Sequence, residues 1–167
     1  MSGKPKSVQQ HSRELPHLGI LQKFRIIVSA AQKYSQRVEK QLGVTGAQLW
    51  IMKEIDVSPG LRVGEVAKKL AIHQTTASNL LDALEKKEMI CKSRQETDQR
   101  IVNLTLTEKG RSLMQKAPEP VRGLLPEALS QMKGDDLIRL GESMDVLLHS
   151  IQQVDEEFAM QPLSFTM

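Results

Sequence analysis

The chain has 167 residues, a length that fits one domain with a substantial core and leaves little room for two independent ones. Aromatic residues make up only 3% of it, while Ala, Leu, Lys, Glu and Gln are abundant, which favours a mostly helical fold with little sheet. The net charge of +3 permits a nucleic-acid partner without establishing one. A single cysteine, Cys91, excludes an internal disulfide framework and fits a reducing compartment.

Charge is distributed unevenly along the chain. The N-terminal portion is basic, with Lys4, Lys6, Arg13, Lys23 and Arg25. The last portion is acidic, with Asp135, Asp136, Glu142, Asp145, Asp155, Glu156 and Glu157. A polyanion should therefore avoid the C-terminal part. Neither a signal peptide nor a membrane-length apolar run is evident, so we expect a cytoplasmic protein with no membrane partner.

Residues 1–17 lack periodicity and are expected to form a mobile arm. A long helix follows, because apolar residues then recur at alternating steps of four and three: Ile20, Phe24, Ile27, Ala31, Tyr34 and Val38. Gly43 ends this helix. Leu21 and Val28 widen the stripe, so we expect the helix to contact both its own domain and a partner helix.

Two short helices are predicted next. Thr45 and Gln48 have the spacing of a capping box at the start of a helix over 46–55, and the turn Ser58-Pro59-Gly60 closes that helix. A third, amphipathic helix has its apolar residues at i, i+3, i+4 and i+7: Val63, Val66, Ala67 and Leu70.

The stretch from His73 to Leu84, HQTTASNLLDAL, has two faces at helical spacing. Ala77, Leu80, Leu81 and Leu84 share the core face. Short polar side chains, suited to close approach to a DNA groove, lie near the helix start: Gln74, Thr75, Thr76, Ser78 and Asn79. Together with the preceding helix this is the form of a helix-turn-helix, although a solvated helix face would look similar.

Beyond Lys87 the apolar period changes from 3.6 to 2, which predicts two short strands. The first contains Ile90, Lys92 and Arg94, and the second has Val102, Leu104 and Leu106 on its buried side. A polar tip over 95–99 joins them. The pattern predicts a winged helix-turn-helix whose basic wing reaches DNA, with Lys92, Arg94 and Arg100 as contacts. The fold class is thus mainly α with a small β wing.

These residues resemble the MarR family of bacterial transcriptional regulators. The resemblance rests on Val66-Ala67-Lys68-Lys69-Leu70, on Leu80-Leu81-Asp82-Ala83-Leu84-Glu85-Lys86-Lys87, and above all on Asp98-Gln99-Arg100 followed by Leu106-Thr107-Glu108-Lys109-Gly110. It covers about residues 18–153. It implies that Arg100 contacts DNA and that Asp98 holds the wing's geometry, which a carboxylate–guanidinium hydrogen bond would achieve.

Two residues depart from the family pattern. Glu88 stands where the family usually has glycine, so either the helix-to-strand turn differs there, or it carries modest strain if Glu88 adopts a positive φ. Asn79 occupies a position that is often basic, which removes a phosphate contact and leaves an amide suited to reading adenine. Asp82, on the groove-facing side, is expected to pair with Lys86 at i+4.

The chain after the wing is expected to build a dimer. Thr107 caps a fifth helix, which Pro118 and Pro120 should break near 117–119, and Pro126 should add a kink. A final helix has its stripe at Leu137, Leu140, Met144, Leu147 and Ile151. We therefore predict a helical dimerisation region over 18–44 and 108–157, a DNA-binding lobe over 45–107, and a C-terminal tail over 158–167.

Other site predictions are fewer. By resemblance, a small aromatic effector would bind between the dimerisation helices and the lobe, with Phe24, Tyr34, Trp50 and Met52 as lining residues, although each could simply fill the core. Cys91 is interpreted as structural rather than redox-sensing. No metal, cofactor or enzymatic motif is evident.

The sequence therefore predicts a homodimeric DNA-binding transcriptional regulator, a repressor acting on double-stranded DNA at a pseudo-palindromic operator and released by a small aromatic ligand. The alternative is a winged-helix dimer that acts as a protein-interaction adaptor without specific DNA binding.

Overall fold

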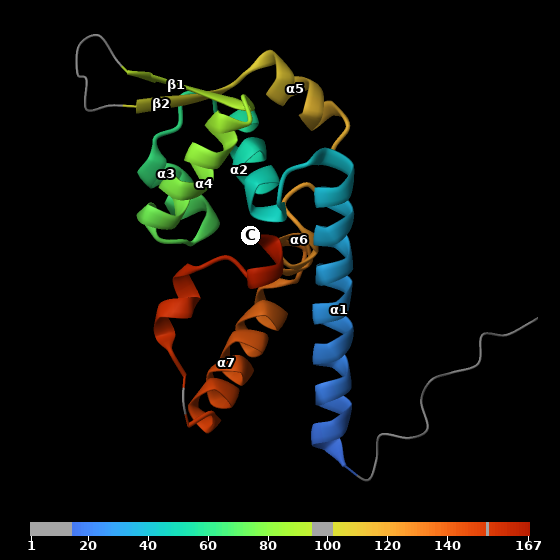
Figure 1. Ribbon diagram of the computed structural model, residues 1–167. Coiled ribbons are helices and arrows are strands. Elements are labelled where there is room, and N and C mark those ends of the chain that lie inside the picture. The colour runs from blue at the N-terminus through green and yellow to red at the C-terminus, as the bar shows by residue number, and fades with distance from the viewer. Residues whose placement is uncertain (1–14, 95–101, 153) are drawn as a thin grey trace, which may run out of the picture.

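The computed structural model describes residues 15–94, 102–152 and 154–167 (Figure 1). Their order along the chain is α1 Pro16–Leu42, α2 Gly46–Val57, α3 Val63–Leu70, α4 Gln74–Lys86, β1 Ile90–Arg94, β2 Val102–Leu106, α5 Glu108–Gln115, α6 Leu124–Ser130, α7 Gly134–Ser150, and the 3-10 turns η1 Glu156–Met160 and η2 Ser164–Thr166. The mainly helical fold with a two-stranded antiparallel sheet confirms the predicted fold class.

Helix α1 divides its apolar stripe between two environments. Ala31, Tyr34 and Val38, in the C-terminal half, are buried, whereas Ile20 and Ile27 are 52% and 45% exposed. Gly43 ends the helix with φ 69, and its N–H donates to Glu39 O at 2.9 Å, as a left-handed cap requires. The C-terminal part of the stripe therefore packs against the lobe. The side chains of its N-terminal part, which extends below the lobe in Figure 1, stay largely exposed.

The lobe, residues 44–106, holds most of the core. The predicted capping box forms, with Gln48 N donating to Thr45 Oγ1 at 3.3 Å and Thr45 N donating to Gln48 Oε1 at 3.1 Å. Helices α2, α3 and α4 pack around side chains that are fully buried: Leu49, Ile51, Met52, Ile55, Val66, Leu81 and Leu84. The packing of these side chains fixes the position of α4 within the lobe.

The two strands form the predicted hairpin on one edge of the lobe. Their register pairs Ile90 with Leu106 and Arg94 with Val102. Leu61 forms an additional bridge to Leu104, which ties the sheet to the turn before α3. Leu104 and Leu106 are buried, in agreement with the alternation in the sequence. The tip, residues 95–101, which includes the predicted Asp98 and Arg100, lies outside the described residues.

Helix α5 begins against the turn that follows α4. Thr107 caps it by accepting from Gly110 N at 3.0 Å, and the same hydroxyl donates to Glu88 O at 2.6 Å. Gly110 is buried so closely that an added Cβ would lie 2.1 Å from Met89 O. The glycine of the Leu-Thr-Glu-Lys-Gly motif is therefore required by this close approach of two backbones.

The proline-rich segment breaks the helix as predicted, and Tyr34 holds the break in place. Helix α5 ends at Gln115 and α6 begins at Leu124. The hydroxyl of Tyr34 lies 3.0 Å from Pro118 O and 2.7 Å from Pro120 O, so it donates to these carbonyls. The predicted kink at Pro126 is wrong, because α6 starts only two residues earlier and the proline occupies its first turn, where no intrahelical N–H is needed.

The lower part of the molecule is open. We use "base" for residues 16–30 of α1 together with α7, which extend below the lobe in Figure 1. Neither segment contains a buried residue. The chain after α7 then turns back on itself, and η2 packs against α1 near the lobe. Within the described residues, no helix has both the length and the apolar composition needed to cross a lipid bilayer.

Candidate nucleic-acid interface and pocket

Helix α4 carries its two faces as the sequence predicts. Ala77, Leu81 and Leu84 are fully buried, and Leu80 is nearly so. The predicted DNA contacts lie on the other side: Gln74, Thr75 and Asn79 are exposed, and Thr76 and Ser78 are half-buried. The helix begins at Gln74, so these hydroxyl and amide groups stand in its first two turns, free to meet a polar surface.

The wing is braced against α4 by Lys92 of β1. Its Nζ lies 3.0 Å from Glu85 Oε2 and also pairs with Asp82. The hydrogen bond from Lys92 lowers the pKa of Asp82 below its usual value. Partial burial lowers the pKa of Lys92, but the two carboxylates outweigh this and raise it. Asp82 therefore pairs with Lys92 of β1 rather than with Lys86, the partner expected from the sequence. Helical spacing relates only residues of one helix, so it could not indicate a partner on a strand.

Three further basic residues near the wing differ in their surroundings. Arg94 is exposed at the end of β1, next to the undescribed tip. Lys87 instead binds the framework, since its Nζ donates to Gly43 O at 2.8 Å and to Gln48 Oε1 at 3.1 Å. Lys109 reaches Lys87 O at 2.8 Å. Lys87 therefore joins the end of α4 to the α1–α2 junction, a contact between distant segments that helical spacing does not indicate.

The turn between α4 and β1 contains the residue that departs from the family pattern. Glu88 has φ 60, the left-handed conformation that glycine adopts without strain. Its side chain pairs with Lys109 at 3.1 Å and is 80% exposed. Of the two alternatives that the sequence left open, a different turn or a strained one, the structure has the strained one.

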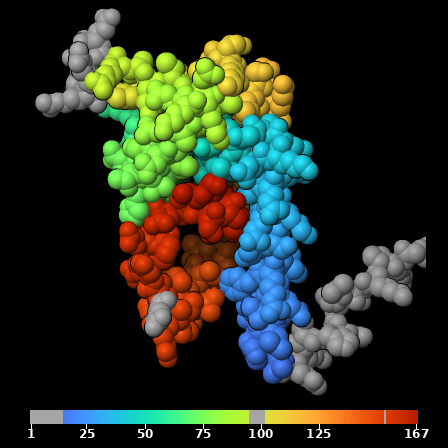
Figure 2. All heavy atoms as spheres, viewed as in Figure 1, coloured from blue at the N-terminus to red at the C-terminus, as the bar shows by residue number. Residues whose placement is uncertain are grey.

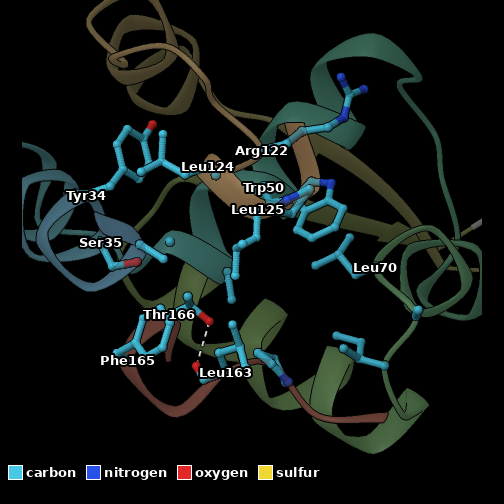
Figure 3. Close-up of a pocket in the computed structure, with 18 of the residues that line it drawn as sticks. Tyr34, Ser35, Trp50, Leu70, Arg122, Leu124, Leu125, Leu163, Phe165 and Thr166 are labelled. Carbon is cyan, nitrogen blue, oxygen red and sulfur yellow. Dashed lines mark hydrogen bonds between the residues drawn. The ribbon is translucent and has the colours of Figure 1, made fainter. Parts of the chain in front are cut away.

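A cavity of about 450 Å³ lies where α1, the lobe and the C-terminal tail meet (Figure 3). Its lining is mostly apolar and includes Ala31, Tyr34, Trp50, Leu70, Ile72, Leu124, Leu125, Leu129, Pro162, Leu163 and Phe165. Tyr34 and Trp50 are two of the four effector-pocket residues that the sequence suggested.

The other two suggested residues do not line this cavity. Met52 is fully buried in the lobe core. It follows Trp50 by two positions, which on a helix turns it about 200° away. Phe24 precedes Ala31 by seven residues, about 10 Å lower along α1. Helical geometry therefore separates both from the space that Tyr34 and Trp50 reach.

A buried carboxylate, Glu54 of α2, stands beside this cavity and was not predicted. Arg122 Nε lies 2.6 Å and Trp50 Nε1 3.1 Å from its Oε1. Lys69 Nζ of α3 lies 3.3 Å from its Oε2. Burial raises the pKa of Glu54, but the hydrogen bonds from Arg122, Trp50 and Lys69 outweigh it and leave the pKa below its usual value. The sequence contained a cue: Glu54 follows Trp50 by four and Ile51 by three, which is a core position.

Comparison with known proteins agrees with this architecture. A model of the MarR family matches residues 44–102, which is the lobe with its first strand and the start of the second. The transcriptional repressor MdtR of Bacillus subtilis (strain 168) is 25% identical over 104 residues, covering 62% of this chain and 66% of MdtR. The organic hydroperoxide resistance transcriptional regulator of the same organism is 31% identical over 93 residues, covering 56% and 62%. The match thus spans less than two thirds of either relative's length.

Among solved structures, the transcriptional repressor CouR bound to a 23-mer DNA duplex superposes with a TM-score of 0.56. It is 26% identical, and the alignment covers 84% of this chain and 99% of CouR. The curated relatives are transcriptional regulators rather than enzymes, in agreement with the sequence interpretation. The family match, the relatives and the shared winged-helix fold all show that this chain is similar to the MarR family.

Proposed function

We propose that this protein is a DNA-binding transcriptional repressor that acts as a homodimer on a pseudo-palindromic operator and is released by a small aromatic ligand. The observation that carries the proposal is the exposed polar face at the start of α4, held on a rigid lobe. Such a face suits the major groove, where amide and hydroxyl groups meet base edges. CouR, with the same fold, has been solved on DNA, and MdtR is named a repressor.

The proposed contacts have separate roles. Gln74, Thr75, Thr76, Ser78 and Asn79 read bases or bind phosphate from α4, and Arg94 and Arg100 bind the backbone from the wing. Asp98 orients Arg100. Lys92 is the exception among the predicted contacts, because its charge already faces Asp82 and Glu85. We assign Lys92 the role of bracing the wing on α4.

The homodimer is supported by the apolar surface of the base. On α7 the predicted stripe is exposed, with Leu137 at 40%, Leu140 at 38% and Leu147 at 38%. Leu18, Ile20, Leu21, Ile27 and Val28 are likewise exposed on α1. Apolar surface of this extent on two helices is typical of a protein interface. A second copy of the chain would cover both helices and set the two α4 helices about one DNA turn apart.

The ligand proposal is supported by the cavity beside Tyr34 and Trp50. Its apolar walls and its volume of about 450 Å³ suit an aromatic molecule of drug-like size. Because the walls come from α1, the lobe and the tail, a bound molecule would alter how the lobe sits on the base. Release of the operator would follow from such a shift.

Fluorescence anisotropy tests the DNA proposal with duplexes from the protein's own upstream region and with random duplexes, at two salt concentrations. We expect a saturable complex that weakens as salt rises. Arg100→Ala should weaken binding to all duplexes and flatten the salt dependence, whereas Asn79→Ala should change discrimination among base substitutions. Ser143→Ala, on exposed α7, is the control. Absence of a saturable complex would favour the adaptor alternative.

Sedimentation velocity tests the dimer. The wild-type chain should sediment as a dimer, and Leu140→Asp together with Leu147→Asp should give a folded monomer. Operator affinity should fall in the same variant, because two half-sites no longer bind as one unit. A wild-type monomer would contradict the dimer proposal and leave the DNA-binding proposal to be judged by anisotropy.

A further inference from the structure

The C-terminal tail, residues 154–167, returns from the end of α7 to the lobe. Figure 2 shows it spanning the space between the lobe and α1, above a hollow in this face of the molecule. It supplies one wall of the cavity through Ala159, Gln161, Pro162, Leu163, Phe165 and Thr166. In Figure 3, Leu163, Phe165 and Thr166 lie opposite Leu124 and Leu125. The tail therefore contacts both the pocket and the lobe.

One hydrogen bond connects this tail to the DNA-reading helix. His73 N donates to Met160 O at 2.8 Å, and His73 is the residue immediately before α4. At the other end of the tail, Thr166 packs against the start of α2, where a Cβ on Gly46 would lie 3.5 Å from Thr166 Cβ. The tail thus bridges the first residues of α4, the start of α2 and α1.

The same bond brings negative charge toward α4. Met160 is the last residue of η1, which begins with Glu156 and Glu157 and is preceded by Asp155. Asp155 Oδ1 accepts from Glu157 N at 3.0 Å. A 3-10 turn advances about 2 Å per residue, so the backbone of Glu157 lies about 6 Å, and that of Glu156 about 8 Å, from Met160. This is comparable with the Debye length of about 8 Å at physiological salt. DNA phosphates approaching the start of α4 would meet this charge.

The tail is held lightly. Neither η1 nor η2 contains a buried residue, and Leu163 is 50% exposed. Within the described part of the chain, the bond to His73 is the one backbone hydrogen bond between the tail and the lobe. A segment with so few buried contacts can detach without unfolding the lobe.

We propose that residues 155–167 form an autoinhibitory strap, which restrains the start of α4 and holds Glu156 and Glu157 on a turn bonded to it, so that DNA binds more tightly when the strap is released. The inference rests on the proposed function, because it concerns regulation of the same surface. Leu163 and Phe165 line the cavity, so a ligand bound there would contact the strap and hold it in place, which would lower DNA affinity in line with the proposed release.

Two full-length variants test the strap by anisotropy with the upstream duplex. Glu156→Gln with Glu157→Gln removes two charges, and we expect affinity to rise about fivefold at low salt and less at high salt. Asp135→Asn with Asp136→Asn makes the same charge change on α7 and should have no such effect. Phe165→Ala loosens the strap at the cavity and should also raise affinity, whereas Phe158→Ala, at a side chain that is 67% exposed, should not.

Amide hydrogen exchange without DNA gives a second measurement. In Phe165→Ala the amide of His73 should exchange faster than in the wild type, because its bond to Met160 opens more often. Unchanged exchange would overturn the claim that the strap holds α4. Unchanged or lower DNA affinity in both strap variants would overturn autoinhibition alone. Failure of every chain to form a saturable complex would overturn the proposed function as well.

Discussion

The lobe and the base of this chain are both rich in leucine and isoleucine, but the exposure of these side chains differs between the two regions. In the lobe, Leu49, Ile51, Leu81 and Leu84 have no exposed surface. In the base, residues 16–30 and α7 have none buried. The lobe's three short helices and hairpin surround a common centre and bury one another's apolar side chains. The two helical segments of the base do not enclose such a centre. The lobe buries its apolar side chains within one chain, whereas those of the base stay exposed to solvent.

The largest predicted effect compares the same substitution in the two regions. Gly110→Ala should destabilise the protein by about 3 kcal/mol, because the new Cβ would lie 2.1 Å from the backbone oxygen of Met89. Gly134→Ala, at the first residue of α7, has no atom within 4 Å of its Cβ and should change stability by less than about 0.5 kcal/mol. Urea unfolding of both variants measures the difference. Equal effects would show that the close approach at Gly110 is absent in solution.

A smaller effect concerns Glu54, which joins lobe helices α2 and α3 to Arg122, between α5 and α6. Glu54→Gln should cost about 2 kcal/mol at pH 7, because Arg122 and Lys69 lose their ionic partner. Since folding lowers the pKa of Glu54, this contribution is complete above the ordinary glutamate pKa of about 4.3 and is lost as the pH falls through the folded value.

Urea unfolding from pH 7 to pH 3 measures this dependence. The difference between the wild type and Glu54→Gln should stay constant down to about pH 5 and then shrink. Glu142→Gln, at an exposed position of α7, is the control and should change stability by less than about 0.5 kcal/mol throughout. A difference that grows on acidification would contradict the depressed pKa.

The smallest predicted effect is at Glu88. Glu88→Gly should change stability by no more than about 0.5 kcal/mol, because relief of the left-handed strain offsets the greater freedom of the unfolded chain and the loss of an exposed pair with Lys109. Glu142→Gly, inside α7, lacks that relief and should cost about 1 kcal/mol. Thermal unfolding of both variants makes the comparison, and a large loss at Glu88 would contradict its φ.

Local patterns in the sequence were enough to predict each helix of the lobe, the hairpin, the caps at Thr45 and Thr107 and the break after α5. Each depends on residues within a few positions of one another, where helical and strand periods or a single hydroxyl decide the outcome. The polar face of α4 was predicted for the same reason.

Contacts between distant segments were decided only by the tertiary structure. Spacing indicated a pair between Asp82 and Lys86, whereas the folded hairpin brings Lys92 to Asp82. Arg122, 68 residues further along the chain, donates a hydrogen bond to Glu54. Tyr34 donates to the carbonyls of Pro118 and Pro120, and His73 donates to Met160 of the tail. Periodicity specifies which face of an element is buried. The partner of a charged group or a hydroxyl depends instead on which groups the packing of the core brings within hydrogen-bond distance.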